Sequence, residues 1–512
     1  MTGRNVRLVF AAALSIALAS SRMSSQELGS ITFPTSGAAS AQAAFLEGVK
    51  DLHNFQFDEA AEAFKRAQKA DANFVMAYWG EAMSYNHPLW AQQDTEAAKR
   101  TLEKIAPTVD ARIAKAGTAK EKAYIGAVDR LFYGSTDKLA RDNAYSEAMS
   151  RMYTEWPQDH EVATLYALSL LGTVRPGDKG FRRQALAASI AEKVYRENPK
   201  HPGAAHFIIH SFDDPDHAPL ALPAARAYAG IAPSAAHALH MPSHIFVQLG
   251  MWDDVVKSNT VAYKAAADLN ARMKLAEGRE DFHTLGWLGY GNLMLGKFDE
   301  AKKNLELAKA AADRNPTNTG VRSGYLGMRA RVILETGQWE KIALEAPPAP
   351  GAANEHANMP GMAMPQYGGN NTWTFIAGYS AAKMGDYATA DAAEAQLKAA
   401  REKLEATNPY GAKPIAIMEK QVGAVSRFAR GQKDEALKLA KEAMDIELTL
   451  AAPSGPPDPI KPAPELYGEL LLEAGRNAEA RAALELSLQR TPNRTPSVKA
   501  MQRATVTGTQ DR

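Results

Sequence analysis

A glycine followed five residues later by an alanine recurs along the chain within similar, helix-forming sequence. Glycine tolerates the left-handed backbone that a tight turn between helices requires, and the small alanine lets the second helix pack closely on the first. The pattern therefore predicts a series of antiparallel helical hairpins. Its clearest copies are Gly296 with Ala301, Gly385 with Ala390, Gly431 with Ala436 and Gly475 with Ala480, and weaker copies follow Gly48 and Leu249.

Prolines end several of these helical units, at Pro199, Pro233, Pro316 and Pro492. The spacing from Pro199 to Pro233 matches the period of about 34 residues that is typical of tetratricopeptide repeats. The small and aromatic packing positions resemble the consensus of that superfamily over residues 40–492. The resemblance implies an all-α fold, a right-handed superhelical solenoid of helix-turn-helix repeats whose first helices line a concave groove.

Three segments interrupt the repeat pattern and are expected to be loop insertions. They span residues 172–180, 347–371 and 453–464, and the last of them is rich in proline. Residues 493–512 are polar and carry no repeat pattern, so we expect a disordered tail there. The predicted solenoid is therefore continuous over 40–492.

Residues 1–19 have the pattern of a signal peptide. Arg4 and Arg7 precede an apolar run that ends in the small-x-small pattern Ala17-Leu18-Ala19, and the run is too short to span a bilayer. We expect cleavage near Ser20, no membrane span in the mature chain, and a periplasmic or secreted protein. The chain has no cysteine, so disulfides and thiolate ligands are excluded.

The charge balance gives no support for nucleic-acid or anionic-membrane binding. The chain has 59 basic and 58 acidic residues, a formal net charge of +1, whereas nucleic-acid-binding domains carry basic patches. No P-loop or dinucleotide fingerprint stands out, so no nucleotide cofactor is expected. A protein or peptide ligand in the groove is compatible with the sequence, which leaves the oligomeric state open.

Histidines are concentrated in the block from His201 to Gly250. His206 and His210 are spaced i, i+4, so they share one helix face, and His240 and His244 repeat that spacing one repeat period later. The same face is thus repeated one unit further along. With no thiolate in the chain, imidazole is the natural ligand for a divalent transition metal, zinc or copper above all. We expect at least three of these four rings to converge on one ion.

Further residues are candidates to complete this site. His237 precedes the turn glycine Gly250 by the same interval as His283 precedes Gly296, so the two histidines occupy equivalent positions. Asp213 continues the face of His210, and His217 follows shortly after. Glu161 and Glu81 are weaker candidates, while isolated histidines are expected to be hydrogen-bonded residues of the core, namely His53, His87, His160 and His356.

Two features of the block bear on its geometry and origin. Pro242 lies inside the expected helix, so the helix either begins near Met241 or kinks there.

The stretch HALHMPSHIF, at residues 237–246, is similar to one in bacterial exported tetratricopeptide-like proteins. That resemblance supports the fold and implies no established activity.

Three functions remain open from the sequence. The first is an exported binding protein with a histidine-rich metal site in the groove, and this is our prediction. The second is a metal-dependent hydrolase, although neither His206–His210 nor His240–His244 has the glutamate that HExxH motifs use as general base. The third is a metal-free scaffold for peptides or proteins. No catalytic residue can be assigned.

Overall fold

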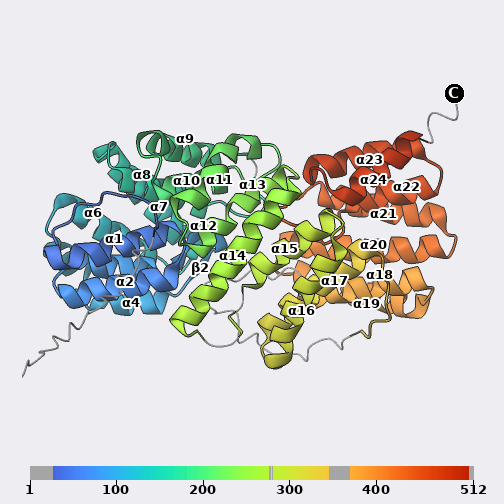
Figure 1. Cartoon of the computed structure of the whole chain (residues 1–512), viewed down its shortest axis with the longest axis horizontal. Coiled ribbons are helices and arrows are strands. Elements are labelled where there is room, and N and C mark those ends of the chain that lie inside the picture. The colour runs from blue at the N-terminus through green and yellow to red at the C-terminus, as the bar shows by residue number, and fades with distance from the viewer. Residues whose placement is uncertain (1–26, 179, 276–277, 280, 345–368, 507–512) are drawn as a thin grey trace, which may run out of the picture.

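The structure is a computed structural model that describes residues 27–506 apart from 179, 276–277, 280 and 345–368. The predicted signal peptide and most of the 347–371 insertion lie outside the described residues. Among the described residues, strands are limited to one antiparallel pair, β1 (Asn86–His87) and β2 (Gln92–Gln93). The all-α fold is confirmed (Figure 1).

The N-terminal third of the chain lies at the left of Figure 1, in blue and teal. Side chains of the residues just before several helices accept from the first-turn amides, and Thr118 with Glu121 forms a complete capping box. The helices are α1 (Ala39–His53), α2 (Phe57–Ala70), α3 (Val75–Met83), the 3₁₀ turn η1 (Pro88–Trp90), α4 (Thr95–Glu103), α5 (Val109–Lys115), α6 (Ala119–Tyr133), α7 (Lys138–Glu155), α8 (His160–Gly172) and α9 (Arg182–Glu197).

The central third contains the histidine block. Its helices are α10 (Pro202–Ser211), α11 (Ala218–Ile231), α12 (Ala236–His240), α13 (Pro242–Gln248), α14 (Trp252–Met273), α15 (Phe282–Met294), α16 (Phe298–Arg314) and α17 (Thr319–Thr336). The C-terminal helices follow at the right of Figure 1, in orange and red. They are α18 (Gly369–Met384), α19 (Tyr387–Glu405), α20 (Pro409–Ala429), α21 (Lys433–Glu447), α22 (Ala463–Glu473), α23 (Asn477–Arg490) and α24 (Thr495–Val506).

The hairpin turns have the predicted construction. The turn glycines adopt positive φ, with values of 70° at Gly296 and 83° at Gly431, and the alanines that follow them in the pattern are fully buried between the paired helices. Between α1 and α2, however, the turn position is held by Phe55, at φ 55°, and not by Gly48, which lies inside α1. A bulky residue in this conformation carries a strain of about 1–3 kcal/mol.

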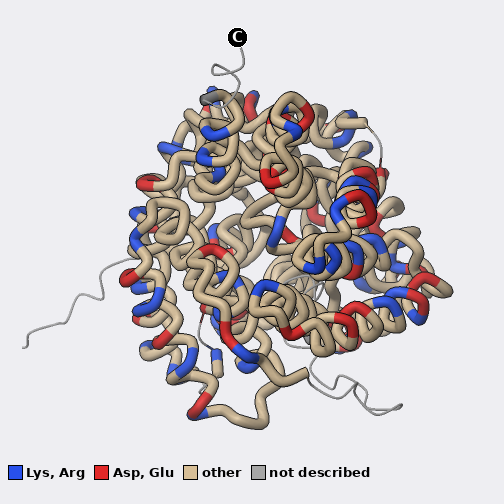
Figure 2. The backbone as a smooth tube through the Cα atoms, turned by 90° about the vertical axis from the view of Figure 1, so that its right-hand side faces the viewer, with Lys and Arg blue, Asp and Glu red and all other residues tan. Residues whose placement is uncertain are grey.

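Two large apolar cores run along the array, one through the N-terminal and central helices and one through the C-terminal helices. Lys and Arg are interspersed with Asp and Glu in the end-on view of Figure 2. No helix in the described part of the chain is both long and apolar enough to cross a membrane.

The prediction of a disordered tail from residue 493 is wrong for the described residues up to 506. Asn493 accepts a hydrogen bond from the Trp252 indole through its backbone oxygen, at 2.9 Å, and helix α24 packs on α23. The guanidinium of Arg494 is buried and pairs with Glu465 at 2.8 Å and Glu335 at 2.6 Å. The polar composition was misleading because these polar groups satisfy one another inside the protein, where they join the C-terminal hairpin to the central helices.

Replacing Arg494 by alanine should lower the free energy of unfolding by about 3–5 kcal/mol, since it leaves the buried Glu335 carboxylate without its cation and Glu465 with Lys461 alone. Chemical denaturation followed by circular dichroism measures the change. Arg476→Ala is the matched control, because its pair with Glu479 is exposed and such pairs contribute about 0–1 kcal/mol. Equal stability of the two variants would contradict the assigned role of Arg494.

Candidate metal centre

Three successive hairpins present their first helices to the same place. These are α10, the pair α12 and α13, and α15. Pro242 occupies the first position of α13, and Met241 between the two short helices keeps helical angles, φ −53° and ψ −35°. The proline therefore interrupts the hydrogen-bond ladder without turning the chain away. His240 and His244 stay on one face despite the break.

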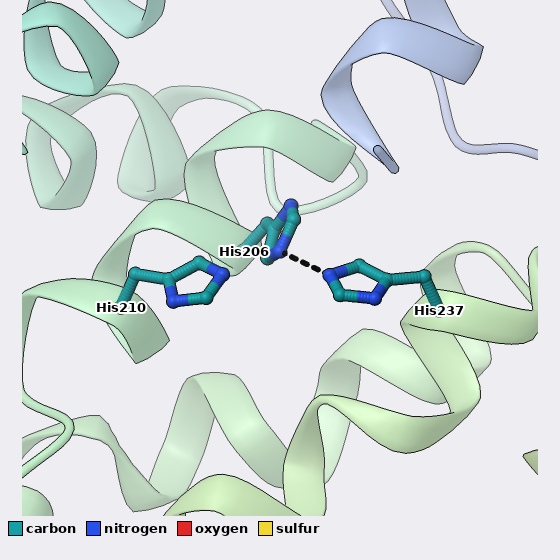
Figure 3. A group of neighbouring side chains, drawn as sticks. All are labelled: His206, His210 and His237. Atoms are coloured by element: carbon teal, nitrogen blue, oxygen red, sulfur yellow. Dashed lines mark hydrogen bonds between the residues drawn. The ribbon is translucent and has the colours of Figure 1, made fainter. Parts of the chain in front are cut away.

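The first histidine group joins α10 to α12. His206, His210 and His237 place one ring nitrogen each within 4.8 Å of one another, and their rings point toward a common space (Figure 3). The Nε2 atoms of His206 and His237 are 3.2 Å apart. The Nε2 atom of His210 is buried and has no hydrogen-bond partner among the described residues.

The second histidine group joins α12 and α13 to α15. His240, His244 and His283 again lie within 4.8 Å of one another through one nitrogen each. The Nε2 atom of His240 is 3.1 Å from that of His244 and 2.9 Å from that of His283. The second group therefore resembles the first group, moved along the array by one hairpin.

Hydrogen bonds behind the rings fix which nitrogen of each imidazole carries the proton. His240 donates from Nδ1 to the Asn259 Oδ1 at 2.6 Å, and the Asn259 amide is oriented by its own bond to the Val255 carbonyl. His244 donates from Nδ1 to the Asp213 carboxylate at 2.6 Å. A neutral imidazole has one proton, so the Nε2 atoms of His240 and His244 face each other as lone pairs.

In the first group, one ring also has its proton-bearing nitrogen fixed by a hydrogen bond. His206 donates from Nδ1 to the backbone carbonyl of His53 at 2.7 Å, which leaves its Nε2 lone pair directed at His237. Acceptors of this kind, a carboxylate, an amide and a carbonyl, are the usual partners behind metal-bound histidines. The sequence pattern predicted Asp213 at the site, and the structure places it behind a ring.

Burial lowers the pKa of five of these histidines, His206, His210, His237, His240 and His283, and so favours their uncharged form. Desolvation lowers the pKa of His206 to about 3 and that of His283 to about 3. Burial first, and then the neighbouring histidines, hold the pKa of His210, His237 and His240 well below the ordinary value. A proton shared between facing rings is thus disfavoured, and neutral rings with free lone pairs are the form that binds metals.

Aromatic side chains close the two groups on opposite sides. The strained residue Phe55 places its ring centroid 4.3 Å from that of His206 and 5.5 Å from that of His237. The Trp287 ring lies 4.5 Å from His244 and 5.0 Å from His240. Phe55 was not among the predicted site residues. The signal was present, since aligning Phe57-Asp58-Glu59-Ala60 with Phe298-Asp299-Glu300-Ala301 puts Phe55 at the turn-glycine position.

The 453–464 insertion reaches the same site, which the sequence pattern did not indicate. Gln248 donates to the Pro453 carbonyl at 2.8 Å and to Asp213 at 3.3 Å. Gly455 lies against Trp287 so closely that an added Cβ would be 2.4 Å from a ring carbon. The loop therefore supports both the Trp287 wall and the Asp213 carboxylate.

The four histidines of the predicted site do not meet at one point. His206 and His210 belong to one group and His240 and His244 to the other. Equivalent positions on neighbouring packed helices are separated by about 8–10 Å between the axes, so each pair takes its third ring from the next helix. His217 lies outside both groups, because it pairs with Asp214 at 2.8 Å and stacks on Phe181.

A third group, His53, Glu161 and His201, has a different character. The Glu161 carboxylate accepts from His53 Nε2 at 2.7 Å and from His201 Nε2 at 3.1 Å, while His201 Nδ1 accepts from the Ala204 amide. Burial alone would raise the pKa of Glu161, but the two histidines lower it to about 2. Every polar atom named here is satisfied, so this group is a hydrogen-bonded core element, as expected for His53. Glu81 lies elsewhere, bonded to Gln68 and Tyr85.

The metal-free protein should lose stability as the pH falls below about 6.5. On acidification, histidines whose pKa is lowered by folding take up protons first in the unfolded chain. Their contribution to the free energy of unfolding is therefore complete above the unfolded pKa of about 6.5, and it is lost as the pH falls toward their folded pKa. His206 alone would account for about 2 kcal/mol at pH 5. Denaturation between pH 7.5 and 5 measures this loss, and His206→Gln should reduce it. A flat profile, or an unchanged slope in the variant, would show that these rings do not titrate as described.

No family model and no curated protein matches the chain. Among solved structures, it is similar to the TPR domain of P58(IPK), at 12% identity over 93% of this chain and 99% of that chain, with a TM-score of 0.24. It is also similar to human IFIT1 bound to m7Gppp-AAAA, at 13% identity over 93% and 91% with a TM-score of 0.36, and to yeast Tom70, at 11% identity over 92% and 96% with a TM-score of 0.28. Its own hairpins, turn glycines and buried alanines define the fold. The chain is an all-α solenoid of tetratricopeptide-like repeats.

Proposed function

We propose that this protein is an exported, tetratricopeptide-like metal-binding protein whose two histidine groups each hold a transition-metal ion, zinc or copper. The observation that carries the proposal is the pair of Nε2 lone pairs of His240 and His244, which face each other at 3.1 Å. Two lone pairs at this distance repel unless a cation lies between them. Burial disfavours a proton in that place.

The nitrogen separations suit metal coordination. Ligand atoms arranged tetrahedrally at about 2.0–2.1 Å from zinc lie about 3.3 Å from each other. The Nε2 pairs at 3.2 Å in the first group and 3.1 Å in the second are close to that value. Each group offers three protein ligands, which leaves one coordination position for water or another small molecule.

The hydrolase alternative has less support. A metal-dependent hydrolase needs a general base beside the open coordination position. Asp213 is the carboxylate in contact with the second group, and its oxygens are engaged by His244 and Gln248. Asp213 contacts the Nδ1 atom of His244, on the side of the ring away from the Nε2 atom that would bind the metal. A protein or peptide ligand in the groove, the ordinary use of such repeats, remains a prediction.

Metal binding should depend on both groups separately. We expect dialysed metal-free protein to bind Zn²⁺ at neutral pH by calorimetry, with weaker binding as the pH falls because ligand imidazoles must be neutral. His210→Ala and His244→Ala should each remove most of the affinity of their own group. Asp213→Ala, which removes the acceptor behind His244 and one of the two acceptors of Gln248, should weaken that group by about 10- to 100-fold.

The matched control is His217→Ala, because His217 belongs to the same block but is bonded to Asp214 outside both groups. It should bind metal as the parent does. Failure of the parent protein to bind Zn²⁺, Cu²⁺, Ni²⁺, Mn²⁺ or Fe²⁺ would rule out the proposed function, and equal loss in His217→Ala would place the site elsewhere.

Export is the second part of the proposal and is supported by residues 1–19 alone. The mature N-terminus of the natural protein is expected near Ser20, and N-terminal sequencing or intact mass spectrometry of the periplasmic or secreted fraction measures it. Recovery of the protein in the cytosol with Met1 or Thr2 as its first residue would contradict export.

A further inference from the structure

The two histidine groups lie side by side and form a single cluster. The ring centroids of His210 and His244, from different groups, are 5.8 Å apart, and those of His237 and His240 are 6.2 Å apart. Two rings of the same group can be farther apart than this, since the ring centroids of His210 and His237 are separated by 6.4 Å. Such spacing is compatible with two ions a few ångströms apart, as in two-metal sites with separations of about 3.5–4 Å.

The ligand set carries no charge. Both groups consist of histidines alone among the described residues, and imidazole binds metals in its neutral form. Among the described residues, the carboxylate in contact with the cluster is that of Asp213. Glu161, beyond His53, already accepts hydrogen bonds from His53 and His201. Burying charge without compensation is costly. Within the described residues, two divalent ions would bring four positive charges against the carboxylate of Asp213, whereas two monovalent ions would bring two.

We propose that the cluster holds a pair of cuprous ions and that this pair binds one molecule of dioxygen between its two open coordination positions. The inference rests on the proposed metal-binding function and specifies the ion and the ligand. Imidazole is a suitable ligand for copper. Three neutral nitrogens per ion satisfy Cu(I) and leave a position free.

The electron balance of the binding step closes within the site. Each Cu(I) gives up one electron and becomes Cu(II), and dioxygen takes up both electrons to become a peroxide dianion bridging the two ions. The O–O bond is kept, no proton is needed, and two Cu–O interactions form. The net charge of the ions with their bridge is +2 before and after, so the cluster binds dioxygen without adding charge to a buried space.

The surroundings suit a small apolar gas. Phe55 packs on the first group and Trp287 on the second. His206 and His240 are buried, and the other four histidine residues are half-buried. The chain contains no thiol, so the protein itself does not supply the reducing electrons, and copper must arrive as Cu(I).

The test uses intact, metal-free protein titrated with a Cu(I)–acetonitrile complex under anaerobic conditions. We expect two copper ions per chain. Admission of oxygen should then consume one O₂ per chain, produce a visible charge-transfer band, and leave the two Cu(II) ions without an electron paramagnetic resonance signal because the bridge couples their spins. Protein loaded with Zn²⁺ should consume none.

Variants from each group make the test specific. His210→Asn and His283→Asn should each retain one copper ion and lose oxygen uptake, and circular dichroism checks that they fold. His244→Asn is a second variant of the second group, and His217→Asn should behave as the parent. Absence of any bound metal would overturn the proposed function as well. Two bound copper ions with no oxygen uptake, or with two uncoupled Cu(II) signals, would overturn only the dioxygen inference. A single copper ion per chain would also contradict the proposal that each group holds an ion.

Discussion

The repulsion between converging imidazole lone pairs is the interaction on which this account depends. Protons are held on the far nitrogens of His240 and His244 by Asn259 and Asp213, so both near nitrogens are bases without protons. The third, fully satisfied group shows that the chain can also place histidines around a carboxylate. His53 and His201 direct their Nε2 atoms at Glu161, and in the described part of the chain no such carboxylate belongs to either of the two all-histidine groups.

The repeat architecture creates the cluster by stacking equivalent helices. A histidine pair on one face of α10 recurs on α12 and α13, and the next helices supply His237 and His283. Two departures from local rules lie at this place. Phe55 adopts a positive φ at the position where the repeat pattern has glycine, and Pro242 interrupts a helix between His240 and His244. Both departures from local rules place side chains around the histidines, which is where such departures are expected in a functional site.

Much of this arrangement could be predicted from the sequence. The glycine and alanine spacing predicted the hairpins, and the distance to the turn glycine predicted the equivalence of His237 and His283. The division into two groups could not be predicted, because it depends on the separation of helix axes. The order of the tail and the contact of the 453–464 loop with the site could not be predicted for a similar reason: Arg494 and Gly455 act through partners such as Glu335 and Trp287, which lie far away in the sequence.

A crystal structure of metal-loaded protein, with anomalous scattering recorded at the absorption edge of the added ion, tests the central claim most directly. We expect one anomalous peak within coordination distance of His206, His210 and His237 and another beside His240, His244 and His283. Peaks confined to His53, Glu161 and His201 or to surface carboxylates, or a cluster with no peak in metal-saturated protein, would contradict it.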